Sequence, residues 1–137
     1  MQAIRSKDTK PELRVRRLLH AMGYRFRLHL KDLAGKPDIA FTRRRKVIFV
    51  HGCFWHGHEA EDCPDGSRPR SNTAYWNLKL DRNAERDRAN ADALEAAGWD
   101  VLTVWACETL DEDALRGRLA AFLGNPVADA GERRAER

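Results

Sequence analysis

The first thirty residues show the two spacings that distinguish helices from strands. Residues 9–12 read Thr-Lys-Pro-Glu, a capping-box pattern with a proline in the first helical turn. Apolar residues then recur at helical spacing, and Gly23 ends the run: Val15, Leu18, Leu19 and Met22. Residues 24–30 alternate strictly between apolar and polar or basic types, which predicts a half-buried strand. A helix followed by a strand is therefore expected at the start of the chain.

The remaining elements follow from similar patterns. Two short apolar runs predict strands at 38–41 and 47–51, separated by a basic turn, and 57–72 is rich in Gly, Pro, Ser and charge, which indicates an irregular loop. We further expect helical structure from 73 to 97 with a break near Asp81, a strand at 101–105, a helix at 111–123 and a charged, disordered tail at 124–137. This order predicts an α/β fold, with a mixed central sheet flanked by helices in one domain over residues 1–123.

Composition and charge narrow the class of protein. Of the 137 residues 34% are charged, and no stretch has the length and apolar character of a membrane span or a signal peptide, so a cytoplasmic protein without membrane association is expected. The net charge is +4, with basic residues crowded into the first thirty positions and into 43–46. Such clusters are often simple solvated faces, but they also suit contact with the phosphates of a nucleic acid, whose binding then weakens steeply with salt.

The three cysteines and one histidine form a candidate zinc set. Cys53, His58 and Cys63 have the spacing C-x4-H-x4-C, and Cys107 follows a later strand. An odd number of cysteines argues against a disulfide framework, whereas three thiolates and an imidazole complete a tetrahedral zinc site. Such a closed site is structural, and it would attach the irregular loop to the sheet. The alternative is three buried thiols and a surface histidine.

A second group of residues suits phosphodiester hydrolysis. Pairing of the two strands at 38–41 and 47–51 would bring the Asp38 carboxylate close to the Val50 carbonyl, and these are hard oxygen ligands for a magnesium ion. His51 and His56 flank the same region, and neutral imidazole accepts a proton near physiological pH. The alternative is a Pro-Asp turn in which Asp38 caps the backbone, beside structural histidines.

These residues resemble a known family, the very short patch repair DNA mismatch endonucleases. The most specific match is residues 47–58, which read Val-Ile-Phe-Val-His-Gly-Cys-Phe-Trp-His-Gly-His. The likeness extends over residues 1–123 through further stretches: 1–4, 8–9, Asp38, 72–76, Asn83, 85–88 and 98–107. The resemblance implies a restriction-endonuclease-like fold with a structural zinc site, and a magnesium-dependent nick beside a T:G mismatch that arises when 5-methylcytosine deaminates.

By position, the resemblance also implies roles for individual residues. Asp38 is similar to the magnesium-binding carboxylate, and His56 to the base that acts on water, with Glu12 orienting it. His51 is similar to the histidine near the leaving group, supported by Asp87. The four candidate zinc ligands coincide with those of the family.

The resemblance gives the aromatic residues a role as well. Phe54, Trp55 and Trp76 are similar to rings that the family inserts between base pairs beside the mismatch, and Met1 and Ile4 fall among its DNA contacts. Unstacking costs least at a mispaired step, so such a wedge also selects for the mismatch. Two successive side chains in an extended segment point in opposite directions, so the Phe-Trp pair cannot fill one core layer.

The sequence departs from the family pattern at three points. Val50 stands where the best-known member has threonine, a tolerable change if the backbone carbonyl is the ligand. Four residues separate His58 from Cys63, where relatives often have one. The chain begins at Met1, where relatives carry an additional basic N-terminal arm that contacts DNA. Apart from these departures, the chain lacks the Glu-x-Lys half of the common restriction-nuclease motif, so a histidine is expected to replace the lysine.

Two other functions fit the same residues. One is a restriction or homing-type endonuclease without mismatch specificity, and the other is a zinc-stabilised DNA-binding module without catalysis. The expected partner in the leading hypothesis is double-stranded DNA with a T:G mismatch, and other DNA repair proteins on the nucleoid are further candidate partners. A nick on one strand needs one active site, so we expect a monomer.

Overall fold

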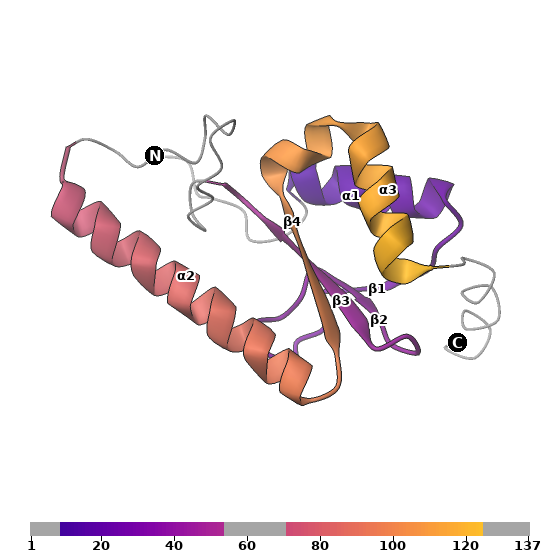
Figure 1. Cartoon of the computed structure of the whole chain (residues 1–137), viewed down its shortest axis with the longest axis horizontal. Helices are drawn as coiled ribbons and strands as arrows, with labels where there is room; N and C mark the ends of the chain where they lie inside the picture. Colours follow the sequence, from indigo (N-terminus) through magenta and orange to yellow (C-terminus); the bar gives the residue numbers. More distant parts are fainter. Residues whose placement is uncertain (1–8, 54–70, 125–137) are drawn as a thin grey trace.

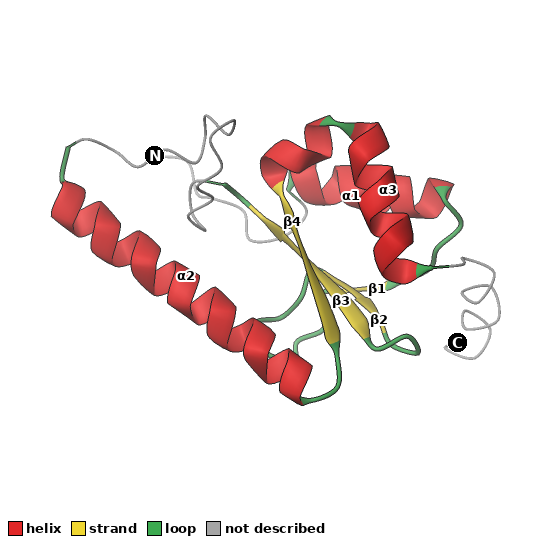
Figure 2. Ribbon diagram, in the orientation of Figure 1, coloured by secondary structure: helices red, strands yellow, loops and turns green. Residues whose placement is uncertain are grey.

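The computed structural model describes residues 9–53 and 71–124. It shows a twisted sheet with helices on both faces (Figure 1), and Figure 2 separates the strands from the helices by colour. The elements are, in chain order, α1 (Lys10–Ala21), β1 (Arg27–Leu28), β2 (Ile39–Phe41), β3 (Lys46–His51), α2 (Thr73–Ala96), β4 (Asp100–Trp105), the 3-10 helix η2 (Ala106–Leu110) and α3 (Glu112–Leu123).

The sheet has the order β1-β2-β3-β4 and is mixed, as predicted. β1, β2 and β3 pair antiparallel, and β3 and β4 pair parallel over six residue pairs, from Lys46↔Asp100 to His51↔Trp105. Parallel neighbours need a long crossover connection, and the segment that contains α2 supplies it. The ends of β3 and β4 therefore lie side by side at one edge of the sheet.

The two faces of the sheet bury different apolar clusters. α1 and α3 cover one face, where Val15, Leu19, Leu115 and Leu119 pack around Ile48, while Leu94 of α2 packs on the other. Val47 and Phe49 belong to the second cluster because successive residues of β3 point to opposite faces. Figure 1 shows the same three layers, with α2 on one side of the sheet and α1 and α3 on the other.

The chain from Thr73 to Ala96 is one continuous helix, so the predicted break near Asp81 is wrong. An aspartate inside a helix costs no more than about 0.7 kcal/mol relative to alanine. No Gly or Pro, which cost more, interrupts the segment. The apolar pattern is irregular there because only Leu80 and Leu94 of α2 are buried. Gly98, with φ 95°, follows its end as expected.

The basic turn at 43–46 is largely engaged within the fold. Arg44 donates to the carbonyl of Leu123, and the Lys46 ammonium donates to the carbonyl of Phe122 at 2.6 Å, both in the last turn of α3. Arg45 donates to the carbonyl of Ala97 at 3.1 Å, just after α2. Cations at helix C-termini satisfy carbonyls that have no partner in the helix. These three side chains therefore hold helix ends, and the structure gives them a role other than phosphate contact.

Candidate active site

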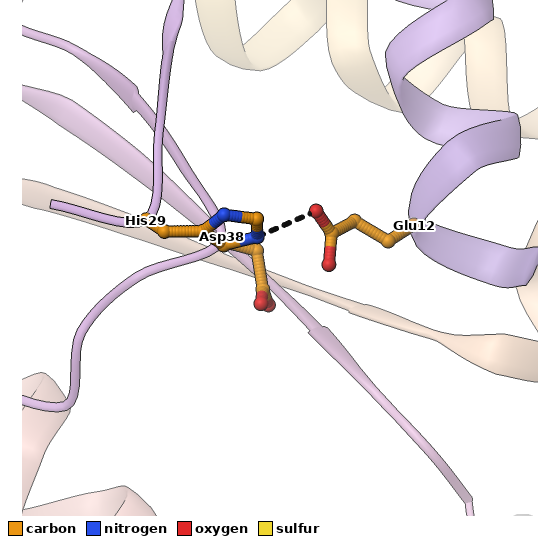
Figure 3. Close-up of side chains that lie close together, drawn as sticks. All are labelled: Glu12, His29 and Asp38. Atoms are coloured by element: carbon orange, nitrogen blue, oxygen red, sulfur yellow. Dashed lines mark hydrogen bonds and ion pairs between the residues drawn. The ribbon is translucent and has the colours of Figure 1, made fainter. Parts of the chain in front are cut away.

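Glu12, His29 and Asp38 bring their side chains together at the edge of the sheet beside α1 (Figure 3). One ligand atom from each lies within 4.8 Å of the others, and no other group of three or more such residues occurs among residues 9–53 and 71–124. Glu12 comes from the first turn of α1, His29 from the residue after β1, and Asp38 from the residue before β2. The three are thus brought together by packing of α1 on the β1–β2 pair.

Glu12 is a buried carboxylate, with only 1% of its surface exposed. Its Oε2 atom accepts from the Arg16 Nε at 3.1 Å and lies 2.8 Å from the His29 Nε2. The Thr9 hydroxyl accepts from the Glu12 backbone N–H at 3.4 Å, which is the predicted helix cap. A buried charge is tolerated only when it is paired and hydrogen-bonded, and the N-terminal end of a helix also favours an anion. The buried Glu12 carboxylate is therefore both paired and hydrogen-bonded.

Asp38 is held by the backbone of β3. Its Oδ2 atom accepts from the Val50 N–H at 2.7 Å. The antiparallel pair Ile39↔Ile48 places Asp38 beside this part of β3. The sequence predicted that strand pairing brings the Asp38 carboxylate to the Val50 carbonyl, whereas the observed contact is with the Val50 amide. The Val50 carbonyl as a magnesium ligand stays a prediction.

His29 is the member of the site that the sequence analysis did not identify. His29 falls inside the strand that the sequence predicted over 24–30. In the structure β1 ends at Leu28, the residue before His29. The register of the β1–β2 hairpin explains the position of His29. Leu28 pairs with Ile39, and because the strands are antiparallel, His29, which follows Leu28, lies opposite Asp38, which precedes Ile39. The His29 N–H donates to the Asp38 carbonyl at 3.1 Å, which continues the pairing.

His51 lies at the end of β3 and is buried, with 9% of its surface exposed. Its ring makes an edge contact with Trp105 at 5.4 Å between centroids and lies 5.6 Å from the Phe49 ring. Asp87, its predicted support, lies half-buried in the middle of α2. His56, the predicted base, lies outside the described residues. The catalytic roles of these three residues stay predictions.

Two of the four candidate zinc ligands meet at the common edge of β3 and β4. Cys53 follows β3 and is buried, while Cys107 is half-buried in η2, directly after β4. The Cys107 backbone N–H donates to the Cys53 Sγ at 3.4 Å. Parallel pairing explains this approach, since both cysteines follow neighbouring strands at the same edge. His58 and Cys63 lie outside the described residues.

Trp76 lies in the first turns of α2 and is half-buried. Its ring contacts that of Tyr75 in an edge-on arrangement, 5.1 Å between centroids. Tyr75 and Leu78 are exposed, so this end of α2 presents apolar surface. The other candidate DNA contacts, Met1, Ile4, Phe54 and Trp55, lie outside the described residues.

His20 is a second histidine of α1, and it lies apart from this site. Its ring stacks on Phe26 at 4.8 Å between centroids. Burial, together with the nearby Arg25 cation, lowers the pKa of His20 below its ordinary value.

No helix within 9–53 and 71–124 has the length and apolar character needed to cross a membrane.

Comparison with known proteins places the chain among DNA-cleaving enzymes. A family model described as DNA mismatch endonuclease Vsr matches residues 1–62. A type II nicking enzyme of Xanthomonas oryzae pv. oryzae is 54% identical over 123 residues, which cover 90% of this chain and 88% of that relative. A type II nicking enzyme of Neisseria meningitidis serogroup A is 44% identical over 119 residues, 87% of this chain and 83% of the relative.

The DNA mismatch endonuclease Vsr of Escherichia coli K12 is 39% identical over 135 residues, which cover 95% of this chain and 85% of that enzyme. Identity at these levels over most of each chain indicates common descent and a shared fold. The chain therefore belongs to the Vsr family and is a DNA endonuclease of the Vsr type.

Proposed function

We propose that this protein nicks one strand of duplex DNA beside a T:G mismatch, the mispair left when 5-methylcytosine deaminates, and that hydrolysis depends on magnesium. The observation that carries the proposal is the convergence of Glu12, His29 and Asp38 within 4.8 Å in a chain of this family. The names of the relatives support the nick and the action on mismatches, since one is described as a mismatch endonuclease and others as nicking enzymes.

The residues present suit a hard divalent cation. Asp38 and Glu12 offer carboxylate oxygens, the ligand type that Mg²⁺ prefers in proteins. Two carboxylates this close repel each other, and a cation between them relieves that repulsion. When bound, the magnesium ion would neutralise charge on the scissile phosphate and orient a water for attack.

The contacts of the chain itself fix where these groups point. The Val50 N–H sets the orientation of the Asp38 carboxylate, and the Arg16 guanidinium donates to the Glu12 carboxylate. The buried His51 ring contacts the rings of Phe49 and Trp105, and these contacts limit its rotation. We assign to His51 a place near the leaving group. A preorganised site of this kind avoids reorganisation during the reaction. We assign proton abstraction from water to His56 and support of His51 to Asp87.

We propose a structural zinc ion held by Cys53, His58, Cys63 and Cys107. The two described cysteines support this, because the Cys107 amide points at the Cys53 sulfur. Zinc binds cysteine in its thiolate form. The ion would tie the chain after β3 to η2.

We further propose that Trp76 acts with Phe54 and Trp55 as a wedge in the base stack. Its position at one end of α2, beside the exposed Tyr75 and Leu78, supports contact with a large apolar partner surface. The enzyme would act as a monomer, since a nick on one strand needs one active site.

The test is a nicking assay on two duplexes that differ only in T:G or T:A at one position, with and without magnesium. We expect cutting of one strand, only with magnesium and faster on the T:G duplex. Equal cutting of both duplexes would favour the restriction-type alternative, and binding without cutting would favour the DNA-binding module. Asp38→Asn should abolish cutting, and Asp92→Asn, the same change at an exposed position on α2, is its control.

A further inference from the structure

Two residues hold the Glu12 carboxylate, and they come from different parts of the chain. Arg16 lies one turn further along α1, and His29 approaches from the end of β1. Both contact the same oxygen, Oε2. We propose that His29 is a positioning residue of the cation site, whose Nε2–H fixes the Glu12 carboxylate next to Asp38. This inference rests on the proposed function of that site.

The contact has one donor and one acceptor. An ionised carboxylate only accepts hydrogen bonds, so we assign the His29 Nε2, 2.8 Å from the Glu12 Oε2, as the donor. A metal ligand must instead present a lone pair. The Nε2 atom of His29 therefore orients Glu12 and is not itself available to bind the cation.

The backbone of His29 connects the same residue to Asp38. Its backbone N–H donates to the backbone carbonyl of Asp38. Its side chain reaches the Glu12 carboxylate (Figure 3), so one residue contacts both acidic residues. His29 adopts φ 51°, a left-handed conformation that residues other than glycine rarely take.

A purely structural role for His29 is the alternative. In that case the imidazole would only compensate the buried charge of Glu12. Arg16 already supplies a full positive charge to the same oxygen through Nε and a second nitrogen, and only 16% of its side chain is exposed. The His29 side chain is 21% exposed and contributes little to the apolar core. Its position is therefore better explained by orientation of the carboxylate.

The experiment compares His29→Gln with His29→Asn. The glutamine Nε2 can reproduce the donor at the reach of the imidazole Nε2, whereas the asparagine amide is one carbon shorter. His20→Gln is the matched control, because His20 stacks on Phe26 away from the site. Three quantities are measured for each variant: the Mg²⁺ concentration that gives half-maximal nicking, the Kd for Mn²⁺ by calorimetry without DNA, and the melting temperature.

We expect His29→Asn to raise both the half-maximal Mg²⁺ concentration and the Mn²⁺ Kd by about tenfold or more, the usual effect of losing a group that orients a metal ligand. His29→Gln should stay within about threefold of the wild type, and His20→Gln should not change either value. The inference is overturned if His29→Asn matches the wild type, if both His29 variants are equally impaired, or if only the melting temperature falls. Absence of nicking by the wild type would instead refute the proposed function, and Mn²⁺ binding would still decide the role of His29.

Discussion

Asp38→Asn separates the chemistry of the site from the stability of the fold. Asparagine keeps a side-chain oxygen that can accept the Val50 N–H, which Asp38 accepts at 2.7 Å. It removes the negative charge that lies within 4.8 Å of the buried Glu12 carboxylate. We therefore expect the variant to lose nicking while becoming more stable than the wild type in magnesium-free solution.

The size of the gain follows from the repulsion between the two carboxylates. At an effective dielectric constant of about 20, unit charges at the 4.8 Å limit repel by about 3.5 kcal/mol. Arg16 and His29 lie against Glu12 and offset much of this. A net gain of about 1 kcal/mol remains, which corresponds to a melting temperature about 4 °C higher for a chain of this size.

Magnesium should reverse the comparison. A ligand that binds only the folded state stabilises it in proportion to the logarithm of its concentration over Kd, about 1.4 kcal/mol at ten times Kd. The wild type should gain this stabilisation, and Asp38→Asn should not. Calorimetric melting of both proteins in magnesium-free buffer and at increasing Mg²⁺ measures the effect, and a chelator is avoided because it would also remove zinc.

Two results would refute this reasoning. A lower melting temperature of the variant without magnesium would show that Asp38 holds the fold through its charge and not only through its oxygen. An equal response of both proteins to Mg²⁺ would show that the cation binds elsewhere. Asp92→Asn should melt and nick like the wild type, since Asp92 is exposed on α2.

Three further substitutions test other parts of the account. Cys107→Ser should reduce the zinc content well below one ion per chain in elemental analysis, and unchanged zinc would contradict the proposed site. Trp76→Ala should weaken binding to a T:G duplex by about tenfold in fluorescence anisotropy, in line with the loss of one stacking contact, and unchanged affinity would remove Trp76 from the wedge. Arg45→Ala breaks the bond to the Ala97 carbonyl and the contact with the Trp99 ring, so it should lower stability by about 1 kcal/mol in denaturant unfolding. The salt dependence of DNA binding should not change, whereas a slope reduced by about one would show that Arg45 contacts a phosphate.

The fold was predictable where local chemistry and periodicity agree. The helix that begins after Thr9 follows its capping signal, and the helix predicted over 111–123 spans Glu112–Leu123 with Asp111 as its cap. The strand predicted over 24–30 contains only two paired residues, because the length of a strand depends on its neighbour and β2 has only three residues. The predicted helix break near Asp81 was wrong. Regular apolar spacing appears only where one helix face is buried, and in α2 only Leu80 and Leu94 are buried.

The site was predictable as far as strand register could be inferred. The approach of Asp38 to Val50 and that of Cys53 to Cys107 both follow from which strands pair and where they end. His29 was missed because its role depends on the register of β1 against β2 and on α1 packing beside that pair. No spacing along the chain carries that information.

The most direct test of the central claim is to locate the cation. Anomalous diffraction from crystals of the protein with a T:G duplex and Mn²⁺ should show a peak about 2.2 Å from a carboxylate oxygen of Asp38, on the side that faces Glu12. A strong peak away from both carboxylates, or none at Asp38 in a complex that nicks its DNA when Mn²⁺ is present, would contradict the account.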